Sequence, residues 1–243
     1  MIKHETFHDF LRNLLERGLR MHRVILFLIL LFVFQAAVYA ENPLFEEGNE
    51  KLAEEIPANW RVPDHFHSTL YPIFSNVPDL FDQKIKIKET KIGTTLNMRP
   101  TLWSLIFKKK SRRTYVLRIN NNENFDGVLF DQVPFESQVG LLAHELMHVK
   151  DYLSRDFFGV AERGWQYLSR RGRIKFEGEI DQMVIDSGLS QFLFEWANYV
   201  LNDSDASDSY KDYKRAIYMT PVEIIEAMEN MGLLDDDGGV EAL

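Results

Sequence analysis

The segment from about Pro134 to Leu153 constrains the fold most strongly, because its pattern predicts one long helix with a core face and a polar face. Apolar side chains recur at three- and four-residue spacing, namely Val139, Leu142, Leu146, Val149 and Leu153. His144 and His148 lie one turn apart on nearly the opposite side of this helix. Two imidazoles so arranged can bind one Zn²⁺ ion, and the adjacent Glu145 can accept a proton from a metal-bound water.

A second copy of this His-Glu-x-x-His pattern, at His4–His8, lies near the N-terminus. It precedes a strongly hydrophobic segment and has no long periodic helix around it. Because a five-residue motif also arises by chance, we interpret this copy as accidental. Metal binding is therefore assigned to His144 and His148.

A catalytic zinc ion normally has three protein ligands and one position open to water. A third histidine in the pattern H-E-x-x-H-x-x-G-x-x-H is excluded, because Asp151 and Ser154 occupy its last two fixed positions. No histidine follows His148, so a ligand from the C-terminal side must be a carboxylate. Glu177 is the best candidate.

Glu177 and Asp181 lie one helical turn apart in the sequence Glu-Gly-Glu-Ile-Asp. This spacing would let Glu177 bind the metal while Asp181 accepts a hydrogen bond from a ligand histidine and fixes its ring. Glu179 and Glu162 are the alternative ligands. A solvated acidic helix N-terminus is the alternative structural interpretation, because the helix dipole favours negative charge there.

The two motifs resemble those of the zincin metallopeptidases, specifically the gluzincins, in which a glutamate is the third ligand. More distantly, they resemble a membrane-associated gluzincin group that carries H-E-x-x-H, often followed by Val-Lys, and then E-x-x-x-D on a later helix. The matching residues are His144, Glu145, His148, Val149, Lys150, Glu177 and Asp181. The resemblance covers roughly residues 113–190, and Ile180 stands where that group usually has a small residue.

The resemblance implies an α+β, zincin-like fold with a small mixed or antiparallel sheet. This sheet would pack on the H-E-x-x-H helix and a second glutamate-bearing helix, and the C-terminal part would be mostly helical. The resemblance also implies one Zn²⁺ per chain, held by His144, His148 and Glu177. Glu145 would be the general base in the hydrolysis of a peptide or protein substrate. The alternatives are a non-catalytic zincin-fold binding module, which retention of Glu145 disfavours, and a zinc-dependent amidase acting on a non-peptide amide such as cell-wall material.

Residues 24–34 form a continuous apolar run that follows two arginines and precedes the small-x-small sequence Val38-Tyr39-Ala40. This pattern is typical of a secretory signal peptide. We therefore expect residues 1–40 to be removed and the protein to be exported, either to a periplasm or out of the cell. The alternative is an uncleaved membrane anchor formed by residues 24–40, although the apolar run is short for a bilayer core of about 30 Å.

Residues 41–243 carry 23 basic and 34 acidic side chains, a net charge of −11, once the five basic and three acidic residues of the leader are excluded. This balance disfavours nucleic-acid binding. The absence of cysteine excludes a disulfide framework. We expect an extended lead-in over residues 41–64, one zincin-like domain over residues 65–234 and a disordered tail over residues 235–243. The sequence indicates no particular oligomeric state.

Three segments of this domain predict strands, at residues 84–88, 94–98 and 114–119. The first two are expected to pair through a turn at residues 91–93. The third precedes the metal-binding helix, and the resemblance implies that its exposed edge pairs with an extended substrate.

Residues 108–113, Lys-Lys-Lys-Ser-Arg-Arg, are the one strongly basic run. A solvated hairpin loop is the simpler interpretation, and peripheral contact with an anionic membrane surface is the alternative. His65 and His67, at the start of a predicted short helix, suit a structural role better than a second metal site, because no partner cluster lies near them in the sequence.

The C-terminal part predicts an apolar helix from Leu189 to about Leu201, and Thr220-Pro221-Val222-Glu223 predicts the capped start of a last helix. A hydrogen-bond donor for a developing oxyanion is also expected from this part. The candidates, which the sequence does not rank, are Tyr210, Tyr213, Arg215 and Tyr218.

Overall fold

The computed structural model describes Trp60 and residues 66–234, and it shows an α+β arrangement with a small mixed sheet and a mostly helical remainder. The strands are β1 (Lys84–Glu89), β2 (Leu96–Pro100) and β3 (Thr114–Ile119). The α-helices are α3 (His67–Asn76), α4 (Leu102–Phe107), α5 (Phe135–Ser154), α6 (Phe157–Gln166), α7 (Arg170–Asp186), α8 (Ser190–Asn198), α9 (Asp208–Ile217) and α10 (Pro221–Asn230). The 3₁₀-helices are η2 (Pro78–Leu80), η3 (Lys110–Arg112) and η4 (Phe130–Gln132), and η5 (Tyr199–Asp203) is a π-helix.

Several expectations fall outside the described residues. They are the signal peptide at residues 1–40, the alternative anchor at residues 24–40, most of the lead-in at residues 41–64 and the tail at residues 235–243. His65 also lies outside them. Within the described part, none of the helices is both long enough and apolar enough to cross a bilayer.

β3 lies in the centre of the sheet, parallel to β1 and antiparallel to β2. The three predicted strands are confirmed, but the predicted pairing of β1 with β2 is wrong. Four of the six residues of β3 are buried, whereas β1 is mostly exposed. Because a strand that is buried on both faces is usually found inside a sheet, this difference explains why β3 is the central strand. Asn120 holds the connection between β1 and β2 across the end of β3, since its Nδ2 donates to the Ile92 carbonyl at 2.8 Å.

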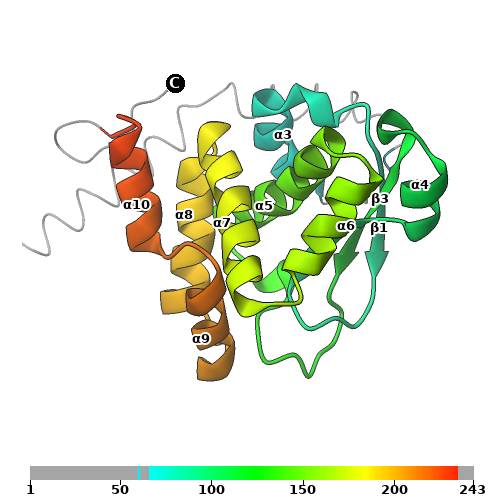
Figure 1. Cartoon of the computed structure of the whole chain (residues 1–243). Coiled ribbons are helices and arrows are strands. Elements are labelled where there is room, and N and C mark those ends of the chain that lie inside the picture. The colour runs from blue at the N-terminus through cyan, green and yellow to red at the C-terminus, as the bar shows by residue number, and fades with distance from the viewer. Residues whose placement is uncertain (1–59, 61–65, 235–243) are drawn as a thin grey trace, which may run out of the picture. The chain divides into compact units, whose positions relative to one another are not determined.

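α5 confirms the predicted H-E-x-x-H helix, and Pro134 is its N-cap. Figure 1 shows α5 crossing the middle of the domain, with the sheet on one side and α7, α8 and α10 on the other. Its predicted core stripe is fully buried from Val139 to Val149. Gly140 packs directly against the backbone carbonyl of Phe192 in α8, so an added Cβ would clash. α5 is therefore the central helix on which the polar residues are placed.

The connection between β2 and β3 is not the simple hairpin loop predicted from the sequence, because it contains α4 and η3. The side chain of Thr101 caps α4 by accepting from the Ser104 backbone N–H at 3.4 Å. Ser104 Oγ accepts from the Thr114 backbone N–H at 3.0 Å, which ties α4 to the start of β3. Periodicity did not predict α4, because most of its apolar side chains face solvent rather than the core.

The C-terminal helices agree with two predictions. α8 and η5 together cover the apolar helix predicted from Leu189 to about Leu201. Thr220 and Glu223 form the predicted capping box of α10, with Pro221 in its first turn. α6 and α9 were not among the predicted helices, and few of their side chains are buried.

Candidate metal centre

α5 and α7 bring three of the predicted residues together. His144 Nε2 lies 3.2 Å from Glu177 Oε2, and His148 Nε2 lies 3.5 Å from the same oxygen. One ligand atom of each residue lies within 4.8 Å of the other two. All three side chains are buried. Two turns of α5 and the facing turn of α7 thus converge on one point.

The spacing of these atoms suits a metal ion. Ligand atoms about 2.1 Å from a tetrahedral zinc ion lie roughly 3.4 Å from one another, in agreement with the observed 3.2 and 3.5 Å. Among the residues that the structure describes, this is the one group of three or more His, Cys, Asp or Glu able to hold an ion. His67, in α3, belongs to no such group. His144, His148 and Glu177 can therefore hold a metal ion.

Asp181 orients the group from behind His144. Its Oδ1 lies 2.7 Å from His144 Nδ1, and a proton on Nδ1 directs Nε2 as the ligand atom. Its Oδ2 accepts a hydrogen bond from the Met219 backbone N–H at 2.9 Å. This is the contact expected from the spacing of Glu177 and Asp181. It joins α5, α7 and the segment after α9 in one network.

The buried carboxylates favour positive charge between the rings. Burial would lower the pKa of His144, but Asp181 and Glu177 raise it to about 10. Burial would raise the pKa of Glu177, but His144 and His148 hold it well below its usual range. The cluster therefore stabilises cationic charge, whether carried by protons or by a metal ion.

Glu145 lies beside this group with one carboxylate oxygen unused. The residue is only 6% exposed, and it lines a cleft next to His148. Within the described part of the chain, Glu145 Oε2 has no hydrogen-bond partner, and neither has His148 Nδ1. Leaving a buried polar group unsatisfied costs about 1–3 kcal/mol, and more for a charged group. Such an oxygen is available to accept a proton.

The cleft has a volume of about 400 Å³ and opens over Glu145 and His148. Its walls come from residues 96–99 of β2, from Arg118 in β3, from α6 and α7, and from Tyr218. Among the described residues, β2 is paired on one side only. The segment expected to offer a free edge, residues 114–119, is β3, which is paired on both sides, so that expectation is wrong. The extensive burial of β3 places it at the centre, and β2 is the edge strand at the cleft.

The alternative ligands are engaged elsewhere. Glu179 is 40% exposed in its side chain, and its Oε2 lies 2.6 Å from Arg163 Nη2. Glu162 is exposed and accepts a hydrogen bond from Gln166. Glu177 lies in the middle of α7, so the interpretation of this segment as a solvated helix N-terminus is wrong.

Tyr218 is the one of the four predicted oxyanion donors that lines the cleft. Its ring centroid lies 5.4 Å from that of His144. Burial, followed by the charge of Glu177, raises the pKa of Tyr218 well above its usual value, so its O–H group stays protonated. Arg215 instead pairs with Asp212 on the surface at 2.8 Å. Tyr210 packs elsewhere, with its hydroxyl 3.3 Å from Thr95 Oγ1.

Several cleft residues lie outside every motif that the sequence offers, among them Tyr167, Arg99 and Arg118. The two arginines are recognisable only when the register of β2 on β3 is known, because that register places them on one face. Tyr167 follows α6, and no sequence signal distinguishes it from the tyrosines outside the cleft.

No family model, no curated protein and no solved structure matches this chain. The functional interpretation of the site therefore depends on its own residues and geometry. The hydrogen-bonded group around the candidate metal centre comes from α5, α7 and the segment after α9, and it spans 75 positions of the chain, from His144 to Met219.

Proposed function

We propose that this chain is an exported zinc metallopeptidase with a zincin-like fold and a gluzincin-type site. His144, His148 and Glu177 would hold one Zn²⁺ ion, and their spacing, donor types and burial support this. When bound, the ion would polarise the scissile carbonyl and lower the pKa of its water to about 7.

Glu145 would act as the general base. Its unpartnered Oε2 would take a proton from the attacking water and later deliver it to the leaving amine. Tyr218 would donate a hydrogen bond from its protonated hydroxyl to the carbonyl oxygen as negative charge develops there. Asp181 would keep the His144 ring in its orientation throughout.

The free edge of β2 supports a peptide substrate. An extended peptide can add to an exposed strand edge through backbone hydrogen bonds, and β2 lines the cleft beside Glu145. A small non-peptide amide has no backbone to pair with this edge. Peptide hydrolysis is therefore preferred to the cell-wall amidase alternative.

The observation that carries the proposal is the buried, unpartnered oxygen of Glu145 next to the His144, His148 and Glu177 group. A structural zinc site or a non-catalytic binding module has no need of a general base at this position. Such a module would be served as well by a neutral side chain, without the cost of burying a charge.

Replacing Glu145 by Gln in the full chain tests this proposal, because the side chain keeps its size and loses its basicity. We expect cleavage of quenched peptides to fall by about 10²–10⁴-fold in kcat, with zinc content unchanged. The exposed Glu162 offers a matched control, and Glu162→Gln should keep the parental rate. An unchanged rate in Glu145→Gln would contradict the assigned base. Cleavage of wall fragments but of no peptide would favour the amidase.

A further inference from the structure

α4 exposes its apolar side chains and buries a polar one, which is the reverse of the usual arrangement of a surface helix. Four of its apolar side chains are largely exposed, at 71% for Leu102, 68% for Trp103, 48% for Ile106 and 64% for Phe107. Its one fully buried residue is the polar Ser104. Figure 1 shows α4 on the outside of the domain, beyond the sheet. A contiguous exposed apolar patch of this kind marks an interaction site.

A hollow of about 850 Å³ adjoins α4 at Phe107, and we refer to it as the basic hollow. It is lined by five basic side chains and one carboxylate, that of Asp82. The basic residues are Lys84, Lys108, Lys109, Arg112 and Arg113. Lys108, Lys109 and Arg112 are exposed, and none of them forms an ion pair within the described residues. Among the described residues, the basic hollow therefore presents cationic charge that no ion pair neutralises.

Hydrogen bonds fix the basic hollow to the rest of the domain. Arg113 is buried, and its Nη1 donates to the carbonyls of Tyr152 and Arg155 at 2.8 and 2.9 Å. Lys110 Nζ donates to the Ser154 carbonyl at 3.0 Å. These contacts place the basic hollow beside the start of α6, where Phe158 is 78% exposed. Apolar side chains thus flank the basic residues on two sides.

We propose that α4 and the basic hollow dock on the surface of an anionic lipid bilayer. The apolar side chains of α4 enter the head-group region, and the basic hollow receives lipid phosphates. Charge complementarity selects an anionic bilayer, because the chain as a whole has a net charge of −9 and is repelled elsewhere on its surface.

Vesicle binding of the full chain tests the proposal, with phosphatidylcholine vesicles compared with vesicles that also contain phosphatidylglycerol. Residues 24–34 can bind both compositions, so the measured quantity is the preference for the anionic vesicles. The change Lys108→Glu/Lys109→Glu/Arg112→Glu should reduce affinity for anionic vesicles by about 100-fold. Lys86→Glu/Lys88→Glu/Lys91→Glu makes the same charge change at exposed lysines outside the basic hollow and should weaken binding much less.

Quenching of tryptophan fluorescence by brominated lipid tests the depth of α4. Quenching should be strong in the parent and greatly reduced in Trp103→Phe. Equal binding to both vesicle compositions would overturn the proposal, and so would equal losses in the two triple variants. Binding of poly-glutamate in place of anionic vesicles would assign the surface to an acidic protein instead.

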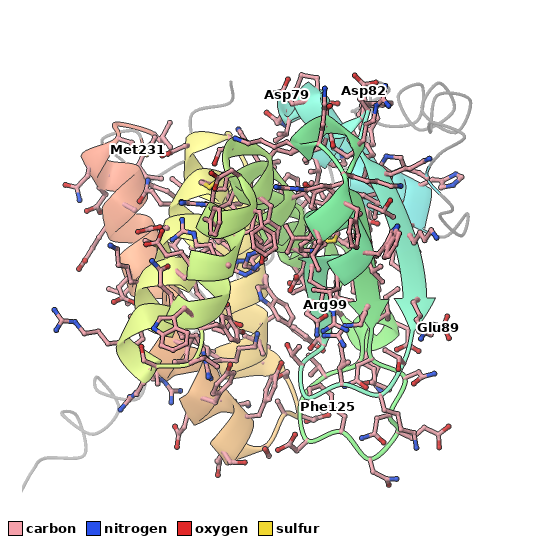
Figure 2. All side chains as sticks on the ribbon, turned by 45° about the vertical axis from the view of Figure 1, so that its right-hand side comes forward. Asp79, Asp82, Glu89, Arg99, Phe125 and Met231 are labelled. Carbon is pink, nitrogen blue, oxygen red and sulfur yellow. The ribbon has the colours of Figure 1, made fainter. Side chains whose placement is uncertain are left out.

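A second inference concerns the cleft, which carries two arginines that form no ion pair among the described residues. Arg99 in β2 and Arg118 in β3 are diagonal neighbours on one face of the antiparallel pair, because Asn97 lies opposite Arg118. Arg118 Nε donates to Asn97 Oδ1 at 2.6 Å, and neither guanidinium forms an ion pair within the described part of the chain. Arg99 is exposed and lies on the face of β2 opposite the buried Leu96 and Met98, and Figure 2 labels it.

On the basis of the proposed function, we infer that Arg99 and Arg118 bind a carboxylate of the peptide substrate. Two guanidinium groups beside each other repel: burial, followed by the charge of Arg99, lowers the pKa of Arg118, and the charge of Glu145 offsets only part of this. An anion between them relieves that repulsion and forms charge-assisted hydrogen bonds. The carboxylate is either that of an acidic side chain near the scissile bond or that of a free C-terminus.

Matched quenched peptides distinguish these cases, with Glu or Gln near the cleaved bond and with a free or an amidated C-terminus. We expect kcat/KM to be about tenfold higher for one of the carboxylate peptides. In Arg99→Gln/Arg118→Gln this ratio should fall to near unity, whereas the surface variant Arg171→Gln/Arg215→Gln should keep it. Equal kcat/KM for all peptides in the parent would overturn the carboxylate site alone. Cleavage of none of them would overturn the proposed function instead.

Discussion

Two regions depart in opposite ways from the usual burial of apolar groups and exposure of charged ones. They are the metal centre between α5 and α7 and the surface formed by α4 and the basic hollow. The metal centre buries two histidines and three carboxylates at exposures between 2% and 6%. α4 exposes four large apolar side chains at fractions between 48% and 71%. Burying ionisable groups and exposing an apolar patch are both unfavourable for a soluble domain. Both regions therefore serve something other than stability.

The two regions differ in where their partners are. In the metal centre the rings and carboxylates face one another, and Glu145, which has one buried oxygen without a hydrogen-bond partner, lines the cleft. At α4 four large apolar side chains stay exposed, and in the basic hollow Lys108, Lys109 and Arg112 form no ion pair within the described chain. Substitutions in the centre should therefore change metal binding, whereas those at α4 should leave the folded protein nearly unaffected.

The largest effect is expected from Glu177→Ala, which removes a ligand from the centre. Loss of a ligand should weaken zinc binding more than the about 10–100-fold cost of losing an outer partner. A chelator competition titration measures this affinity. Glu179→Ala is the control, because Glu179 pairs with Arg163 and Lys175 outside the centre. If Glu179→Ala had the larger effect, the third ligand would be Glu179.

Asp181→Asn should weaken zinc binding by about 10–100-fold. An asparagine oxygen can accept from His144 Nδ1 or from the Met219 N–H, whereas the aspartate accepts from both. The same titration measures the change. A parental affinity would show that Asp181 does not orient the ring, and a loss as large as that of Glu177→Ala would make Asp181 a ligand.

Gly140→Ala tests the packing that holds α5 in place. The added Cβ would overlap the Phe192 carbonyl, so we expect the free energy of unfolding to fall by about 1–3 kcal/mol. Gly178→Ala in α7 is the matched change, because its Cβ meets no atom within 4 Å. That change should stabilise the protein by roughly 0.5–1 kcal/mol. Urea denaturation measures both, and equal effects would contradict the close contact of α5 with α8.

The smallest effect is expected at α4. Trp103→Ser/Phe107→Ser should change the free energy of unfolding by no more than about 0.5 kcal/mol per site, because both side chains are exposed. Phe74→Ser, at a residue only 2% exposed, should cost about 3 kcal/mol or more. A loss of several kcal/mol in the α4 variant would mean that its apolar side chains stabilise the fold, and the contrast between the two regions would disappear.

The sequence predicted those parts of the fold that depend on local pattern. Pro134 and the apolar stripe bounded α5 to within about a residue, and Thr220 with Glu223 predicted the start of α10. Strand order was not predictable in this way. Alternation identifies a strand, but only the burial of β3 against both neighbours places it between β1 and β2.

The residues of the candidate site also fall into those that local sequence patterns predict and those that depend on tertiary contacts. His144, Glu145 and His148 are adjacent in sequence, and the one-turn spacing of Glu177 and Asp181 is a local signal as well. Tyr218 could not be ranked above Tyr213 or Arg215, because its place depends on the Met219–Asp181 hydrogen bond between distant segments. α4 was missed because its exposed apolar face breaks the rule on which periodicity relies.

The zinc content of the purified full chain tests the central claim most directly. We predict one zinc ion per chain in the parent and in Glu145→Gln, and none in His144→Ala/His148→Ala. A chain that remains free of zinc while both histidines and Glu177 are intact would contradict the account. Equal zinc content with and without the two histidines would also contradict it.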